Sequence, residues 1–418
     1  MNPQLLIAGA GIGGLATALA CSQRQTGRHS IAIQTRLFER TFVFEEAGAG
    51  IQLGPNATRR LQAWGLGAAL DQLAAFPSRL AVNCAYSGKE LARLALGSHM
   101  QQRYGAPYAT MHRADLQALL LQAVQATGQV ALHQACAVGG FETLPGKVTA
   151  QMVPQEGAIT QTAYEGHALI AADGLWSAVR QQCLHDGPAP TTGHLAWRAL
   201  VPQASLPANL RINHINVWLG RQLHVVAYPV RGGELLNVVV IIQASAMPLL
   251  AELSAGAACQ HWSHAASAQA LQAALPAISP ALKDLLYAMP QWRLWVLCER
   301  AALSGPQGMT DARWAGGRVA LLGDASHPMR PYLAQGAGMA LEDADELAVQ
   351  LLSASPTHWP QALQAYANVR WQRNARVQAR AVRNGRVFHA TGWLRLARNA
   401  SLQLFGPRLL DQPWLYGY

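Results

Sequence analysis

Three glycines near the start of the chain have the spacing of a phosphate-binding turn. Gly9, Gly11 and Gly14 lie in QLLIAGAGIGGLATALA, where an apolar run is followed at once by small residues at helical spacing. Glycines placed in this way allow a tight turn, close approach of backbone N–H groups to a pyrophosphate, and close packing of a helix on a strand. The pattern therefore indicates a strand, a turn and a helix that can bind a dinucleotide.

A carboxylate follows the next expected strand. This strand covers roughly IAIQTRLFE and ends in Glu39, where a carboxylate can accept hydrogen bonds from the hydroxyls of an adenosine ribose. Glu39 lies farther from the glycine turn than is usual, and we interpret RQTGRHSIAIQT as an insertion in the connection. The alternative is that Glu39 is an exposed acid at a strand end.

Two later turns also place an acid after an apolar strand. Asp173 and Gly174 follow ALIAA, a pattern that by itself usually marks an ordinary turn and that gains weight from the other segments. Gly323 and Asp324 open GDASHPMRPYLAQGAGMALEDADELA, in which two prolines stiffen a loop before a glycine-rich helix that begins near Gly336. An acid, a stiff loop and an open helix start together favour a large polar ligand at this loop.

Two further segments have a composition suited to such a ligand. The stretch EEAGAGIQLGPNATRRLQAWGL reads as a glycine-rich loop, closed by Pro55 and Asn56, that can lie flat against a planar group. Arg113 begins the amphipathic pattern RADLQALLLQAVQA, where a guanidinium can reach a phosphate or a polyol. An exposed surface arginine is the alternative for this position.

A histidine and a tyrosine share one face of an expected strand. Residues 191–297 are rich in β-forming runs, among them INVWLG, RQLHVVAYPV and ELLNVVVIIQ. Alternation along QLHVVAYPV puts His224, Val226 and Tyr228 on the same face. An imidazole, with an ordinary pKa of about 6.5, can take a proton near neutral pH, so His224 is a candidate base; the alternative is a hydrogen-bonded sheet histidine.

The composition of the whole chain restricts the class of protein. The 418 residues, 51% of them hydrophobic, are enough for two domains with large cores. No apolar run reaches the roughly 18 residues of a membrane span, and the N-terminal residues lack the pattern of a signal peptide. We therefore expect a cytoplasmic protein with no integral membrane association.

Cysteines and charges point to no metal or nucleic acid. The six cysteines are scattered, without the clustering of a metal site or a disulfide framework. The net charge of +10 comes mostly from dispersed arginines, dense only from Arg370 to Arg398, and no recognition motif accompanies them. An anionic cofactor or substrate explains this charge.

Taken together, these segments resemble the single-component FAD-dependent aromatic hydroxylases, which include salicylate, 3-hydroxybenzoate 6- and 6-hydroxynicotinate hydroxylases. The resemblance covers nearly the whole chain. It rests on the glycine turn and on GAGIQLGPNA, HRADL, DGLWSAVR, AWRALVP and GDASHPMRPYLAQGAGMALEDA, which occur in the family order.

The resemblance implies an α/β fold: a Rossmann-like FAD-binding domain with an inserted mixed or antiparallel β-sheet substrate domain and a C-terminal helical segment. The implied boundaries are 1–78, 109–190 and 298–355 for the FAD-binding domain, 79–108 and 191–297 for the substrate domain, and 356–418 for the helical region. The implied cofactor-binding residues are Gly9, Gly11, Gly14, Glu39, Arg113, Asp173, Gly174, Gly323, Asp324, Pro331, Gly336 and Gly338.

The resemblance also implies the roles of particular residues. Asp324 is expected to bond the ribityl chain of FAD, and the loop from Pro331 to Gly338 to cover the isoalloxazine. A His-x-x-x-Tyr pair faces the flavin in one subgroup, and His224 and Tyr228 reproduce its spacing. They are therefore the expected catalytic residues, with the histidine as the base and the tyrosine orienting the ring substituent or relaying the proton.

The implied reaction uses NADH or NADPH to reduce FAD and O2 to form a flavin C4a-hydroperoxide. This electrophile hydroxylates a small phenolic or hydroxylated heteroaromatic acid, with or without loss of its carboxylate. Arg198, Arg330 and Tyr332 are candidates for binding that carboxylate, and the sequence does not choose among them. The alternatives are an epoxidase or quinone-pathway hydroxylase, and a flavin-containing protein that binds an aromatic ligand without turnover.

The C-terminal region is expected to be helical, with arginines at helical spacings. Arg373, Arg376, Arg380 and Arg383 usually form a solvated face when they are spaced in this way. A homodimer surface and a weak contact with anionic lipid are the alternatives.

Overall fold

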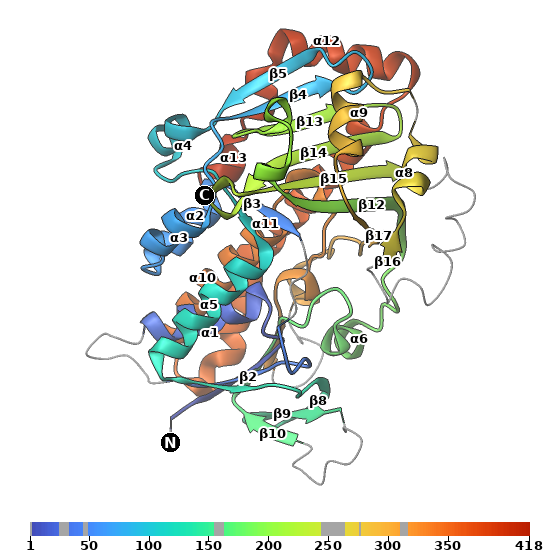
Figure 1. Ribbon diagram of the computed structural model, residues 1–418. Helices are drawn as coiled ribbons and strands as arrows, with labels where there is room; N and C mark the ends of the chain where they lie inside the picture. Colours follow the sequence, from blue (N-terminus) through green and yellow to red (C-terminus); the bar gives the residue numbers. More distant parts are fainter. Residues whose placement is uncertain are drawn as a thin grey trace.

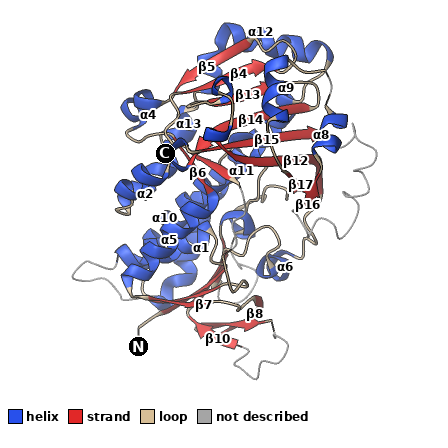
Figure 2. Cartoon of the chain, in the orientation of Figure 1, coloured by secondary structure: helices blue, strands red, loops and turns tan. Residues whose placement is uncertain are grey.

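The structure is a computed structural model that describes residues 2–24, 33–44, 49–153, 163–243, 264–275, 277–309 and 317–418. Two sheets dominate this part of the chain: a five-stranded parallel sheet near the N-terminus and an eight-stranded sheet at the opposite end (Figure 1). The termini and the two sheets are well separated in the view, with helices packed between and around them (Figure 2). The α/β fold class predicted from the sequence is confirmed.

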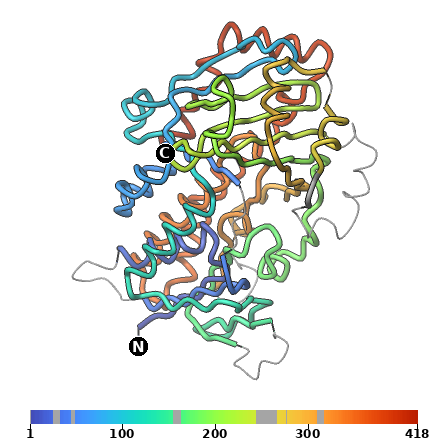
Figure 3. Tube along the Cα trace, viewed as in Figure 1, coloured from blue at the N-terminus to red at the C-terminus, as the bar shows by residue number. Residues whose placement is uncertain are grey.

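The parallel sheet is assembled from segments far apart in the chain (Figure 3). Its strands, in spatial order, are β18 (Val319–Leu321), β11 (Ala168–Ala171), β1 (Gln4–Ala8), β2 (Gln34–Phe38) and β7 (Val130–His133). Every neighbouring pair is parallel. β1, β11 and β18 are short and mostly apolar because both faces of the parallel sheet are covered there.

Side chains of β1 alternate between two cores. Leu5 and Ile7 pack in the core that includes helices α1 (Ile12–Gln23), α5 (Arg113–Thr127) and α10 (Gly336–Leu352). Leu6 and Ala8 face the other core, beneath a three-stranded sheet. This small sheet consists of β8 (Val138–Leu144), β9 (Lys147–Met152) and β10 (Ala163–Gly166), with α6 (Ala178–Leu184) beside it.

The eight-stranded sheet is mixed. Its spatial order is β16 (His264–Ala266), β17 (Trp292–Cys298), β12 (Thr191–Pro202), β15 (Leu235–Gln243), β14 (Leu223–Val230), β13 (Ile215–Leu219), β4 (Arg79–Cys84) and β5 (Glu90–Ala95). All pairings are antiparallel except that of β13 with β4. The strands expected around residues 215–243 are therefore present, and an earlier segment completes the edge of the sheet.

The glycine-rich segment before residue 57 differs from the expectation. Residues 45–48 lie outside the described residues, and Gly50–Leu53 form strand β3 rather than a loop. β3 pairs antiparallel with β6 (Ala109–His112), which satisfies backbone groups that a loop would leave to solvent. The remaining helices of this region are α2 (Pro55–Ala63), α3 (Gly67–Leu73) and α4 (Gly97–Tyr104).

Helices cover the eight-stranded sheet and end the chain. One face of the sheet packs on α8 (Ala268–Ala274) and α9 (Pro280–Tyr287). The long α11 (Trp359–Phe388) packs beside α10 and against β18, and it is followed by α12 (Gly392–Leu410) and α13 (Pro413–Tyr416). Within the described ranges, no helix is long and apolar enough to cross a membrane.

The expectation of a solvated arginine face on α11 is only partly right. Arg376 and Arg383 are exposed, but the side chain of Arg373 is only 10% exposed and pairs with Glu342 of α10 at 2.6 Å. Arg370 is fully buried. The expectation was wrong for Arg373 because α10 presents buried carboxylates to this side of α11, which spacing along one helix does not reveal.

Candidate active site

The glycine turn between β1 and α1 is tightly packed at two positions and open at the third. Gly9 has a φ of +94°, and a Cβ there would lie 2.5 Å from the carbonyl oxygen of Ala172. A Cβ on Gly14 would lie 1.8 Å from the carbonyl oxygen of Gly9. A Cβ on Gly11 would meet no described atom within 4 Å, and no side chain caps the helix that begins after it. The first N–H groups of α1 thus face a space that an anion can enter.

Glu39 lies over this turn. Its Oε2 accepts a hydrogen bond from the N–H of Ala10 at 2.9 Å, and its Oε1 accepts from the N–H of Thr41 at 3.0 Å. Both bonds hold the carboxylate at the carboxyl edge of the parallel sheet, next to the glycine turn. Glu39 is therefore held against the glycine turn, and its binding of an adenosine ribose stays a prediction.

Asp173 and Gly174 follow β11 at the same edge. Gly174 has a φ of +80°, which glycine adopts at little cost. The Oδ1 atom of Asp173 is buried and has no hydrogen-bond partner among the described residues. Burial raises the pKa of Asp173 to about 6, although hydrogen bonds from Ser177 and nearby backbone groups act in the opposite direction. A buried oxygen without a partner is a position where a ligand hydroxyl can donate.

The loop from Gly323 to Gly338 lies at the start of α10. Gly323 has a φ of +60°, and the side chain of Asp324 is exposed. Its Oδ1 lies 3.9 Å from the position that a Cβ on Gly336 would take, so the acid is close to the helix start. Pro331 begins the short 3-10 helix η9 (Pro331–Leu333), and no side chain caps α10. A Cβ on Gly338 would lie 2.9 Å from the side-chain amide oxygen of Gln335, so a larger residue there would require that side chain to shift.

A buried network of charged and polar side chains connects this loop to α10 and α11. Asp343 Oδ2 accepts from the N–H of Gly323 at 3.2 Å and lies 2.5 Å from His327 Nε2, while its Oδ1 accepts from Arg370 at 2.7 Å. Burial alone would raise the pKa of Asp343, but His327 and Arg370 hold it well below the usual value. His327 thus joins the loop to α10 through its contact with Asp343.

His224 lies in a cluster of aromatic rings that the sequence did not reveal. It is 2% exposed, and its Nδ1 lies 2.8 Å from Nε2 of His389, at the end of α11. The ring centroid of Tyr332 is 5.1 Å away, and that of His194 lies 5.0 Å from His389. His194 and His389 come from β12 and α11, and no pattern near either residue marks it as part of a site.

Burial sets the protonation states of His224 and Tyr228. It lowers the pKa of His224 well below the usual value, and His389 and His194 lower it further. It raises the pKa of Tyr228 well above the usual value, although Arg198 acts in the opposite direction. Near neutral pH the histidine is therefore an uncharged acceptor and donor, and the tyrosine keeps its proton.

The arginines proposed for a carboxylate differ in their partners. The guanidinium of Arg330 bonds both carboxylate oxygens of Glu299. The guanidinium of Arg198 instead stacks on the ring of Trp295 at 3.7 Å, and no described carboxylate pairs with it. Burial lowers the pKa of Arg198 to about 10, with Tyr228 acting in the opposite direction. Arg198 is thus a cation beside Tyr228 whose charge lacks a described anionic partner.

Arg113 lies on the same side of the molecule. It begins α5, its N–H donates to the carbonyl oxygen of Ala49 at 2.8 Å, and its charge also lowers the pKa of Arg198. No ion pair to its side chain is present within the described ranges. Arg113 and Arg198 are therefore close enough for their positive charges to repel each other.

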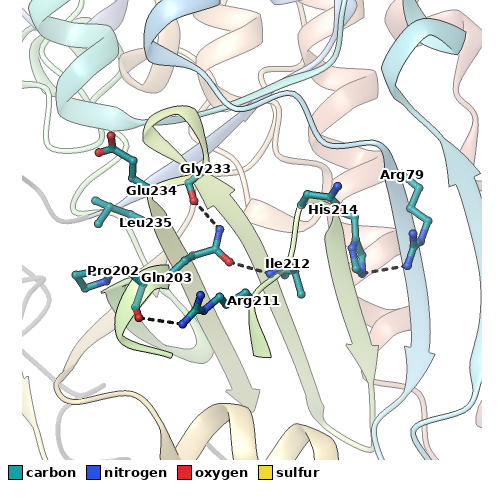
Figure 4. Close-up of a pocket in the computed structure, with 11 residues that line it drawn as sticks. Arg79, Pro202, Gln203, Arg211, Ile212, His214, Gly233, Glu234 and Leu235 are labelled. Atoms are coloured by element: carbon teal, nitrogen blue, oxygen red, sulfur yellow. Dashed lines mark hydrogen bonds between the residues drawn. The ribbon is translucent and has the colours of Figure 1, made fainter. Parts of the chain in front are cut away.

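One open groove lies away from these residues. It has a volume of about 870 Å³ and lies at one end of the strands β4, β12, β13 and β15, where a guanidinium nitrogen of Arg79 lies 3.4 Å from Nε2 of His214 (Figure 4). None of the residues expected from the sequence lines it. A second groove, of about 620 Å³, lies beside the Asp173 turn between Arg40 and Trp176.

Comparison with known proteins identifies the family. Residues 3–381 match the family described as the FAD binding domain, and the chain belongs to that family. A 3-hydroxybenzoate 6-hydroxylase of Polaromonas naphthalenivorans (strain CJ2) is 35% identical over 416 residues, which cover 99% of this chain and 96% of that protein. The 3-amino-4-hydroxybenzoate 2-monooxygenase PtnB3 of Streptomyces platensis is 32% identical, covering 100% and 96%. A solved salicylate hydroxylase substrate complex matches with a TM-score of 0.79 at 25% identity, covering 100% of this chain and 95% of that one.

These relationships make the protein a flavin-dependent aromatic monooxygenase with FAD as its cofactor, and the resemblance seen in the sequence is confirmed. The described residues fit this cofactor. The open position at Gly11 admits a pyrophosphate, and the unpartnered oxygen of Asp173 admits a ligand donor. The assignment of individual residues to parts of FAD stays a prediction, as do the exact domain boundaries.

Proposed function

We propose that this enzyme hydroxylates a small phenolic or hydroxylated heteroaromatic acid, using NADH or NADPH and O2. One observation carries the proposal: the buried neutral imidazole of His224 shares a strand face with Tyr228, and beside that tyrosine lies the cation Arg198, which pairs with no carboxylate of the described residues. The names of the two relatives above, both hydroxybenzoate-modifying enzymes, support the same substrate class.

FAD, when bound, supplies the electron transfer and the oxygen activation that amino-acid side chains lack. We assign its pyrophosphate to the glycine turn and its adenosine ribose to Glu39. Asp324 is assigned to the ribityl chain, and the uncapped start of α10 to the negative charge of the reduced flavin. Arg113 and Asp173 are assigned to the remaining polar groups of the cofactor.

In this proposal His224 is the general base. A phenol reacts well with an electrophilic oxygen donor only after its hydroxyl has lost a proton, and a neutral imidazole can accept that proton. Tyr228 remains protonated and can donate a hydrogen bond that orients the ring substituent. The surrounding rings of Tyr332 and Phe388 keep water away from the base.

Arg198 is the proposed partner of the substrate carboxylate. Arg330 is less suited because both of its bonds to Glu299 would have to break before it could bind another anion. Tyr332 has a buried hydroxyl with no hydrogen-bond partner among the described residues, and it can add one bond to the substrate or the flavin. The cytoplasmic location stays a prediction, and a homodimer surface stays an alternative for the arginine-rich helix.

The experiment is NAD(P)H oxidation by the FAD-loaded enzyme with a panel of hydroxybenzoates and hydroxynicotinates, recording peroxide and hydroxylated product together. The proposal expects at least one acid to stimulate oxidation with product formed in step. Stimulation only by nonphenolic compounds would favour an epoxidase or quinone-pathway hydroxylase. Ligand binding without stimulated oxidation would favour a protein that binds aromatic ligands without turnover.

A further inference from the structure

A second histidine lies within hydrogen-bond distance of Nδ1 of the proposed base, His224. Nδ1 of His224 lies 2.8 Å from Nε2 of His389, which directly follows the last residue of α11. Both side chains are buried, and 165 positions of sequence separate them. No described residue bonds the other nitrogen of His224, so Nε2 is the atom available to a substrate.

We propose that His389 is a positioning residue that holds His224 in the tautomer with its proton on Nδ1. This inference rests on the proposed function, in which His224 is the base. A neutral imidazole carries one N–H and one lone pair, so the hydrogen bond at one nitrogen decides the role of the other. When His389 Nε2 accepts from Nδ1–H, the lone pair of His224 is left on Nε2.

The opposite arrangement would disable the base. If His389 donated to Nδ1, the proton of neutral His224 would lie on Nε2, and that atom could donate but not accept. In the proposed step the substrate O–H bond breaks, its electron pair stays on oxygen, and a new N–H bond forms at Nε2 of His224. The Nδ1–H remains bonded to His389 throughout, so the proton count balances without another reactant.

The groups around the pair keep His389 uncharged. The pKa of His389 is lowered to about 3, mainly by burial. His194, Arg398 and Arg330 act in the same direction. His389 is therefore a neutral acceptor near pH 7. When His224 gains a proton, their hydrogen bond becomes charge-assisted and stronger, which offsets part of the cost of a buried cation.

The neighbouring strands β13 and β15 place the aliphatic residues Leu219 and Ile241 beside His224, so the rings and charges that face the pair come from other elements. His194 comes from β12, Tyr332 from η9, and Phe388 and His389 from the end of α11. The charged groups beyond these rings are Arg330, its partner Glu299, and Arg398. Of these groups, His389 is the one with a hydrogen bond to the base.

Three variants separate the hydrogen bond from packing. His389→Gln places an amide oxygen near the position of Nε2 and can restore the acceptor. His389→Leu has no acceptor. His194→Leu is the matched control, because it removes a neighbouring ring, 5.0 Å from that of His389, that has no direct hydrogen bond to the base.

The first readout is the tautomer of His224 in the FAD-loaded enzyme, measured by nitrogen-15 NMR of the imidazoles. Signals are assigned by their loss in His224→Ala. We expect protonated Nδ1 and bare Nε2 in the wild type, His389→Gln and His194→Leu, and a mixture of tautomers in His389→Leu. A wild-type proton on Nε2 would overturn the inference whatever the substrate proves to be.

The second readout is kinetic. We expect His389→Leu to slow hydroxylation about 10-fold while leaving FAD content and flavin reduction unchanged, since one hydrogen bond to the base is lost. The pH at which a bound phenol ionises, followed by its absorbance without oxygen, should rise by about one unit. His389→Gln should recover both values, and equal losses in His389→Gln and His389→Leu would contradict the inference.

The variants distinguish a failure of the proposed base, His224, from a failure of the positioning role of His389. If His224→Ala uncouples flavin oxidation from hydroxylation while His389→Leu behaves as the wild type, His224 is the base but His389 does not position it. If His224→Ala leaves coupling unchanged, the proposed base falls instead. A loss in His194→Leu equal to that in His389→Leu would assign the effect to packing and would reject the role of the hydrogen bond.

Discussion

Replacing Arg198 with methionine removes a cation while keeping a long side chain that can still pack on Trp295. In the proposed function this guanidinium binds the substrate carboxylate, and no described carboxylate competes for it. A hydrogen bond to a charged group is worth about 1.5–3 kcal/mol. A loss of about 2 kcal/mol corresponds to a roughly 30-fold higher dissociation constant.

The assay is titration of the FAD-loaded enzyme with an aromatic acid that stimulates oxidation, followed by the change in flavin absorbance. The same titration with the corresponding phenol that lacks the carboxylate is the control ligand, and its affinity should change by less than about 3-fold, since it loses no ion pair. Arg330→Met is the control variant, because Glu299 already pairs with that arginine.

The pH dependence gives an independent check of the same residue. Burial depresses the pKa of Arg198 to about 10, so the cation is present below that pH and is lost as the pH rises through it. Affinity for the acid should therefore fall near pH 10 in the wild type, and this fall should be absent in Arg198→Met. Equal losses for the acid and for the phenol, or no loss at all, would refute the assignment of Arg198.

Three other substitutions test the remaining assignments. Asp324→Ala should yield protein with little bound FAD, measured by the ratio of flavin to protein absorbance; full FAD content would remove Asp324 from its proposed role. His224→Ala should keep FAD and its reduction but slow hydroxylation by about 100-fold or more and release peroxide, since a general base contributes roughly that much; unchanged coupling would reject the base. Arg370→Met leaves Glu342 and Asp343 buried without their shared partner, so the free energy of unfolding measured in urea should fall by about 3–5 kcal/mol; a fall below about 1 kcal/mol would contradict the importance of this network.

Local patterns predicted the elements whose residues depend on near neighbours. The glycine turn is an example, since Gly9 and Gly14 contact each other and lie between one strand and one helix. Alternation along β14 also placed His224 and Tyr228 on one face, because side chains of a strand alternate whatever packs against them. The expected loop at Gly50 was wrong because its pairing partner, β6, lies about sixty positions along the chain.

The sequence by itself therefore determined the family, the cofactor and the strand that carries the proposed base. Only the tertiary structure decided which groups surround that base and which arginine has no carboxylate partner in the part of the chain that the structure describes. His389 meets His224, and Glu299 meets Arg330, through contacts between distant segments that leave no periodic pattern in either one. Burial, which sets the pKa of His224 and of Arg198, is likewise a property of the packed chain, because it depends on which elements exclude water from each side chain.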